Sequence, residues 1–147
     1  IYHKTQMPIY FIAIGNAAGH NDSAGINRVS SYLDESVHFE SYLDGNIFDL
    51  MNIIRNASCY CGTSLHGLIT SMSFDVPRVG LLPNLRKQIN YMNTWDIEEM
   101  PKGIEPQQLG HAVNIAMSIS KERLTEKSEF LTDAYLNSFK ESSKVFN

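Results

Sequence analysis

The chain has 147 residues, of which 43% are hydrophobic and 19% are charged, and its formal net charge is −4. This length and composition suit one ordinary hydrophobic core, so we expect a single domain over residues 1–147. The 12 lysines and arginines are spread from Lys4 to Lys144, which argues against a nucleic-acid partner. The longest apolar run, residues 7–14, is shorter than the ~20 residues that span a bilayer. We therefore expect no transmembrane segment and a cytoplasmic protein.

The first part of the chain alternates predicted strands and helices. Residues 7–15, MPIYFIAIG, are almost uniformly apolar, which is typical of a strand covered on both faces in a parallel sheet. A helix should begin at one of the N-cap candidates Asn21, Asp22 or Ser23 and end near Leu33, before a short strand at residues 36–41. A second helix should start near residue 46, because its apolar residues recur at helical spacing: Ile47, Leu50, Met51 and Ile54.

The pattern continues with strands at residues 58–62 and 76–82, separated by a helix that begins near Leu65. Two further amphipathic helices are predicted over residues 107–118 and from residue 121 to the end, and Trp95 should be a packing anchor. This alternation predicts an α/β fold, a Rossmann-like parallel sheet flanked by helices.

Cys59 and Cys61 are the two cysteines of the chain. At positions i and i+2 of a predicted strand, their side chains share a face but lie too far apart for a relaxed disulfide, so we expect buried free thiols. None of the five histidines forms a His-x3–5-His pair that could complete a zinc site. We predict no metal and no cofactor.

The stretch CYCGTSLHGLITSMSFDVPRVGL, residues 59–81, contains the strongest candidate site. Helical spacing places His66 away from the apolar stripe, in the first turn of a helix that follows a strand. Open α/β sheets bind ligands at the carboxyl ends of their strands, and a first helical turn has unpaired amides that favour anions. Thr63 and Ser64 could cap this turn or contact the anion. His66 could contact a ligand or make only a capping or core hydrogen bond.

The run GTSLHGLITSMSFDVPRVGL, continuing into LPNLRKQINYMNTWDI and the closing helices, resembles the C-terminal half of the polysaccharide pyruvyl transferase family. The Leu65-His66-Gly67 core with its flanking pattern carries the resemblance, whereas the first half of the chain matches only in its order of strands and helices. The fold implied is similar to the C-terminal domain of a GT-B-type fold.

The resemblance implies transfer of a pyruvyl group from phosphoenolpyruvate, the co-substrate, to two hydroxyls of a free or lipid-linked saccharide. The product is a cyclic ketal in exopolysaccharide or cell-surface polysaccharide, made in the cytoplasm and at most peripherally at the inner membrane face. The resemblance also implies a catalytic role for His66 at the phosphoenolpyruvate site. The neighbouring residues of the same turn would bind substrate: Thr63, Ser64, Leu65 and Gly67.

Ser64 departs from the family pattern, which has an arginine immediately before Leu-His. Arg86 and Lys87, the latter at the family's lysine position, are the first candidates to replace that positive charge. We expect both to bind substrate, although a solvated helix end is the alternative. Weaker candidates are Arg28 and Arg78. His20 and Asp22 follow the first strand and could face the same crevice, with His20 a further substrate-binding candidate. The alternative is that they only make hydrogen bonds within the loop and cap the helix.

Two alternatives keep the fold but change the function. The strand, Gly, Ser, helix and Val-Pro strand pattern also resembles donor domains of nucleotide-sugar-dependent GT-B-type glycosyltransferases and epimerases, which usually carry a glutamate in this helix. Residues 65–74 contain no acidic residue. The second alternative is a non-catalytic sugar-binding domain. The chain starts at Ile1 and family members carry a second domain before this one, so we expect a C-terminal fragment that is inactive alone.

Overall fold

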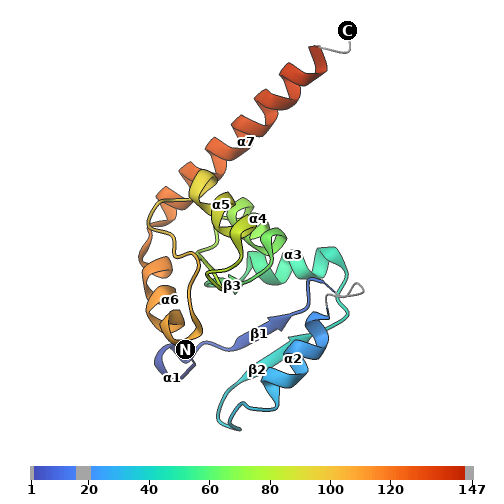
Figure 1. Ribbon diagram of the computed structural model, residues 1–147, viewed down its shortest axis with the longest axis vertical. Coiled ribbons are helices and arrows are strands. Elements are labelled where there is room, and N and C mark those ends of the chain that lie inside the picture. The colour runs from blue at the N-terminus through green and yellow to red at the C-terminus, as the bar shows by residue number, and fades with distance from the viewer. Residues whose placement is uncertain (1, 16–20, 145–147) are drawn as a thin grey trace. The chain divides into compact units, whose positions relative to one another are not determined.

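A computed structural model describes residues 2–15 and 21–144 (Figure 1). The chain divides into two compact units, residues 1–53 and 54–147. The expectation of a single domain stays a prediction.

The first unit contains two parallel strands and short helices. Its elements are α1 (Tyr2–Thr5), β1 (Ile9–Ile12), α2 (Asp22–Ser30), β2 (Phe39–Tyr42) and α3 (Ile47–Arg55), which runs into the second unit. Ile9 of β1 pairs with Phe39 of β2. Asn21 is the N-cap of α2, as predicted, because its side chain accepts a hydrogen bond of 2.9 Å from the Ala24 amide. Tyr10 in β1 is 45% exposed, so the prediction that this strand is covered on both faces was wrong.

The second unit contains the other strand pair and most of the helices. Its elements are β3 (Tyr60–Gly62), α4 (Leu65–Ser73), β4 (Arg78–Gly80), α5 (Arg86–Trp95), the 3-10 helix η1 (Pro106–Gln108), α6 (Leu109–Ser118) and α7 (Lys121–Ser143). β3 and β4 run parallel, with Cys61 opposite Val79. The predicted α/β class with parallel strands flanked by helices is therefore confirmed, although the strands pair as β1–β2 and β3–β4 and are shorter than predicted.

Apolar side chains from several elements form the core of the second unit. The buried side chains include those of Leu68, Met72, Val79, Met92, Met100 and Ala116. The predicted apolar faces of α4 and α6 are therefore confirmed. The closing helix α7 also forms as predicted, with Leu124 and Leu131 buried, but Tyr135 is 57% exposed. Trp95 ends α5 and is 36% exposed, so its predicted role as a packing anchor was wrong.

The second unit also contains a buried ion pair. The Arg78 guanidinium, 1% exposed, donates two hydrogen bonds to the Asp96 carboxylate, the one from Nε to Oδ2 measuring 2.9 Å. Arg78 also donates to the Val76 carbonyl, and the Ile97 amide donates to Asp96 Oδ1 at 2.7 Å. These bonds satisfy both charges, as burial of an ion pair requires.

The carboxyl end of α4 is closed by Asp75. Asp75 has φ +54°, and its amide and that of Val76 donate to the carbonyls of Met72 and Ser71, which is the hydrogen-bond pattern of a Schellman cap. The Asp75 carboxylate then accepts hydrogen bonds from two hydroxyls of α7, at 2.9 Å from Thr125 and also from Ser128. Asp75 therefore ties α4 to α7.

Candidate active site

The candidate site lies in the turn between β3 and α4. Thr63 is exposed, and Ser64 is the N-cap, its Oγ accepting a hydrogen bond of 3.3 Å from the Gly67 amide. The first helical hydrogen bond runs from the Leu68 amide to the Ser64 carbonyl at 3.1 Å. A capping serine explains why α4 begins at Leu65, as predicted. The hydroxyl proton of Ser64 remains available to a ligand, because the cap uses only its oxygen as an acceptor.

His66 lies in the first turn of α4 and is exposed. The buried residues of α4 include Gly67, Leu68 and Met72, so the prediction that His66 lies off the apolar face is confirmed. Among the described residues, no partner hydrogen-bonds the His66 imidazole. Within the described residues, His66 therefore makes no capping or core hydrogen bond through its side chain. By helix geometry, the amides of Leu65 and His66 have no carbonyl partner within α4.

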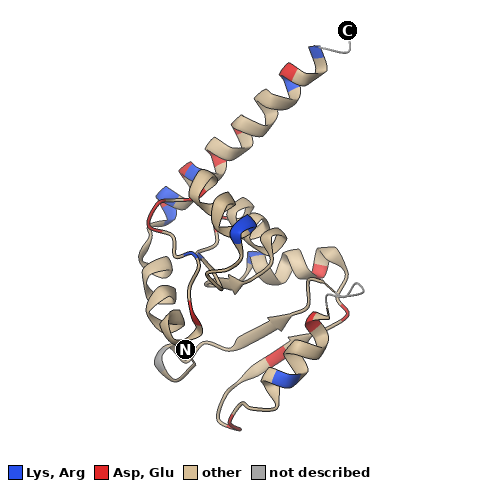
Figure 2. Cartoon of the chain, in the orientation of Figure 1, with Lys and Arg blue, Asp and Glu red and all other residues tan. Residues whose placement is uncertain are grey.

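Two cations begin the next helix. Arg86 and Lys87 are the first residues of α5, and both side chains are exposed. The first turn of α5 contains no acidic residue, so two positive charges sit at the positive end of the helix dipole. An anion bound there would relieve this unfavourable arrangement. Along α7, by contrast, lysines and arginines are interspersed with acidic residues (Figure 2).

The two helix starts lie at the same edge of the β3–β4 pair, because α4 follows β3 and α5 follows β4 and the two strands are parallel. A direct hydrogen bond links them: Gln88 of α5 donates from Nε2 to the Gly62 carbonyl at 2.9 Å. The structure thus brings the turn of residues 63–67 and the Arg86–Lys87 pair to one edge.

The sequence reasoning did not single out Gln88. Its signal was a polar residue on an otherwise apolar helix face, one turn before the buried Met92.

The remaining candidates are not gathered at this edge. Arg78 is buried against Asp96 and has no free donor face for a substrate. Arg28 is exposed in α2 of the first unit. The Asp22 carboxylate accepts from the amides of Ile14 and Gly15 at 3.1 and 2.8 Å, which is the loop-bonding alternative. His20 lies outside the described residues.

Cys59 and Cys61 are free thiols, as predicted, and their sulfurs are 3.9 Å apart. They are half-buried rather than buried. The hydrogen bond with Cys61 and burial both raise the pKa of Cys59, which keeps that thiol protonated near neutrality. Within residues 2–15 and 21–144, no group of three or more histidine, cysteine or acidic side chains could hold a metal ion.

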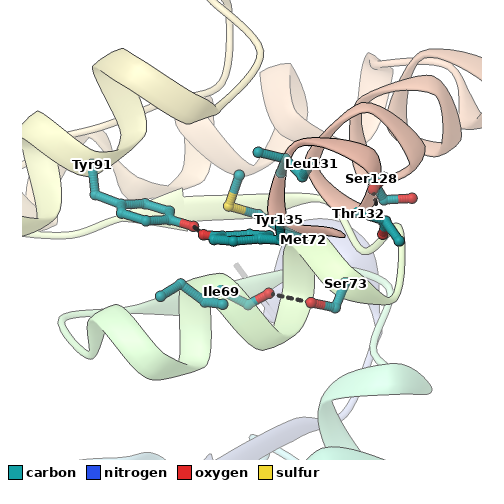
Figure 3. Close-up of a pocket in the computed structure, with 8 residues that line it drawn as sticks. All are labelled: Ile69, Met72, Ser73, Tyr91, Ser128, Leu131, Thr132 and Tyr135. Carbon is teal, nitrogen blue, oxygen red and sulfur yellow. Dashed lines mark hydrogen bonds between the residues drawn. The ribbon is translucent and has the colours of Figure 1, made fainter. Parts of the chain in front are cut away.

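A small cavity of about 50 Å³ lies between α4, α5 and α7 (Figure 3). The Tyr91 and Tyr135 side chains point toward one another there, with their hydroxyls 3.0 Å apart. Burial and this hydrogen bond raise the pKa of Tyr91. This volume holds about one or two water molecules, and none of the candidate site residues lines it. It is a packing gap rather than a substrate site.

The described helices include none that is both long and apolar enough to cross a membrane.

Comparison with known proteins gives one family. The family model described as polysaccharide pyruvyl transferase matches residues 2–84, more than half of the 147 residues. No curated protein and no solved structure gives a significant match. The match includes the first part of the chain, where we saw only a generic order of elements, and the whole Thr63–Gly67 turn. It ends before Arg86 and Lys87, so it does not test their correspondence to family residues. The chain belongs to the polysaccharide pyruvyl transferase family, a family of transferases.

Proposed function

We propose that this chain is part of an enzyme that transfers a pyruvyl group from phosphoenolpyruvate to two hydroxyls of one saccharide residue, giving a cyclic ketal. The observation that carries the proposal is the exposed His66 in the first turn of α4, at the carboxyl end of a parallel strand, within the part of the chain that matches the family. A histidine can move protons near neutral pH, and a first helical turn binds anions, which are the two requirements of this reaction.

The chemistry requires two proton transfers and one leaving group. The methylene carbon of phosphoenolpyruvate gains a proton and becomes a methyl group. Two sugar oxygens form bonds to the central carbon of phosphoenolpyruvate. The bond from that carbon to the phosphate oxygen breaks, and inorganic phosphate leaves. The two sugar hydroxyls together lose two protons: one is equivalent to the proton gained by the methyl group, and the other is taken up by the leaving phosphate. We assign to the His66 imidazole the transfer of a proton between a sugar hydroxyl and the methylene carbon.

The anionic groups of phosphoenolpyruvate need donors that are already in place. The Leu65 and His66 amides, the Thr63 hydroxyl and the Ser64 hydroxyl proton can serve the phosphate or the carboxylate from the α4 side. Arg86 and Lys87 add positive charge from α5, in place of the arginine that the family carries where this chain has Ser64. His20 remains a proposed contact in the first unit.

The proposed acceptor is a free or lipid-linked saccharide in exopolysaccharide or cell-surface polysaccharide synthesis, handled in the cytoplasm or at the inner membrane face. We also propose that residues 1–147 are the C-terminal part of a two-domain protein. They should not turn over substrate alone, because one domain supplies only half of the walls of a crevice between two domains.

The experiment is to incubate the full-length protein with phosphoenolpyruvate and free or lipid-linked saccharides and to measure phosphate release. Release that depends on the acceptor, together with a pyruvate ketal on the product, supports the proposal. Calorimetry separates the alternatives: a nucleotide sugar that binds while phosphoenolpyruvate does not would favour the GT-B-type donor domain. Binding of neither would favour a non-catalytic sugar-binding domain.

A further inference from the structure

Gln88 is a polar side chain in a place where the fold otherwise puts apolar ones. It lies on the inward face of α5, one turn before Met92, and is only 2% exposed. Glutamine is seldom fully buried unless its amide is hydrogen-bonded. Its burial at the edge that carries His66 therefore requires an explanation beyond packing.

The amide of Gln88 acts on one peptide group. Its Nε2 donates to the Gly62 carbonyl at 2.9 Å, and the same oxygen accepts from the Leu81 amide at 3.0 Å. Gly62 ends β3, and its carbonyl shares a rigid peptide plane with the amide of Thr63. Both acceptor directions of the carbonyl are therefore used, which fixes the plane from which the Thr63–Gly67 turn departs.

The oxygen of the Gln88 amide remains without a hydrogen bond, although its nitrogen is bonded to β3. Because Nε2 donates to Gly62, the orientation of the amide is set, and Oε1 has no hydrogen-bond partner among the described residues. Oε1 packs over Gly80 of β4, where a Cβ would lie 3.2 Å from it and 2.7 Å from the Met92 sulfur. The glycine at position 80 leaves the room that Gln88 needs to reach β3.

Gln88 also directly follows Arg86 and Lys87 in α5. The Gln88 side chain thus connects the first turn of α5, which carries the two cations, to the end of β3, which precedes His66. We infer that Gln88 is a positioning residue, which sets the Arg86–Lys87 turn and the Thr63–Gly67 turn in register for a single anionic substrate. This inference rests on the proposed function.

The test uses the full-length protein with Gln88→Met and Gln88→Glu. Methionine keeps the length and apolar packing but cannot donate. We expect kcat/KM for phosphoenolpyruvate to fall about 10- to 100-fold, the scale of a misplaced catalytic group, with faster amide hydrogen exchange at residues 63–67. Asn93→Met, an exposed position of the same helix, is the matched control and should change neither quantity.

The pH dependence of the activity of Gln88→Glu distinguishes positioning from packing, because a packing role alone would not make the activity depend on pH. An ionised carboxylate cannot donate to the Gly62 carbonyl, whereas a protonated carboxyl can. Activity of this variant relative to wild type should therefore recover as the pH is lowered, and that of Gln88→Met should not. Unchanged kinetics and unchanged exchange in Gln88→Met would overturn the inference. So would a ratio of Gln88→Glu to wild-type activity that is independent of pH.

Failure of the proposed function gives a different result. If wild-type protein neither binds nor consumes phosphoenolpyruvate, the proposed function is wrong, and the exchange rates of residues 63–67 still decide whether Gln88 orders the turn. Normal exchange in both Gln88 variants would then reject the positioning role as well.

Discussion

The two ends of α4 treat their polar groups in opposite ways. At the carboxyl end, the amides of Asp75 and Val76 each make a backbone cap bond, and the Asp75 carboxylate accepts hydrogen bonds from two hydroxyls of α7. At the amino end, Ser64 caps one amide, and His66 is exposed with no described partner for its imidazole. The polar groups at the carboxyl end are thus satisfied within the protein, and we propose that those at the amino end bind a ligand.

The largest expected effect is at the open end. His66→Ala or His66→Asn should lower kcat for pyruvyl transfer in the full-length protein by about 10²- to 10⁴-fold, the usual contribution of a general acid or base. Because His66 is exposed and lies off the packed face, the thermal midpoint should stay close to that of wild type. A collapse of the midpoint would show that His66 is structural and that the contrast between the two ends is false.

The buried ion pair is the extreme case of satisfied polar groups. Asp96→Asn removes the charge that faces Arg78 while keeping the side-chain size. Leaving the guanidinium buried without its partner should cost about 3–5 kcal/mol in the free energy of unfolding, measured by urea denaturation. A cost below about 1 kcal/mol would mean that Arg78 reaches solvent or another anion. That result would return Arg78 to the list of possible substrate contacts.

Ser64→Arg adds a positive charge at the open end, where the family resemblance implies an arginine. The guanidinium should strengthen phosphoenolpyruvate binding by about 1.5–3 kcal/mol, measured by calorimetry. The same change removes the N-cap bond to Gly67, which should cost about 0.5–2 kcal/mol of stability.

Ser64→Ala is the matched control for the Ser64→Arg variant. It should show the same stability loss without the gain in affinity. Ser64→Glu should weaken phosphoenolpyruvate binding. An affinity that is equal in the arginine and alanine variants would contradict anion binding at this turn.

Asp75→Ala and Asp75→Gly separate the two functions of the closed end. Both remove the bonds from Thr125 and Ser128, but only alanine is strained at φ +54°, by about 1–2 kcal/mol. The alanine variant should therefore be the less stable of the two in urea denaturation, with phosphoenolpyruvate affinity near wild type in both. Equal stabilities would show that the left-handed conformation is not retained.

The smallest effect is a dependence of stability on pH. Burial tends to raise the pKa of Asp75, but the hydrogen bonds from Ser128, Thr125 and Lys121 together outweigh it and hold the pKa below its ordinary value of 3.8. The charged form is thus favoured in the folded state. Its stabilisation is present above pH 3.8 and is lost as the pH falls through the lowered folded pKa. The stability difference between wild type and Asp75→Asn should shrink over this acidic range, and a constant difference would contradict the assignment.

Local patterns in the sequence predicted the helices of the second unit well, because capping and periodicity are local properties. Ser64 before Leu65, and Leu68 with Met72 one turn apart, were enough to place α4 and to put His66 on its polar side. The same reasoning failed for Trp95 and Tyr10, since exposure depends on which elements cover a residue and not on the residue alone.

The candidate site was predicted only in part for the same reason. The Leu65-His66-Gly67 turn is contiguous in sequence and could be found, whereas Arg86 and Lys87 became candidates only because the resemblance implies a lysine at position 87. Gln88 bonds Gly62 from 26 residues away, and the pairing of Arg78 with Asp96 spans 18 residues. Such contacts depend on how α5 packs on the strands, which no local pattern encodes.

Amide hydrogen exchange along α4, with and without phosphoenolpyruvate, would show whether the amino end of this helix binds the substrate. The full-length protein should show slower exchange at residues 64–67 when phosphoenolpyruvate is added, because the anion occupies the open amides of the first turn. Residues 75 and 76, whose amides are already bonded to Met72 and Ser71, should not change. Protection at neither end, or protection by a nucleotide sugar and not by phosphoenolpyruvate, would contradict the account.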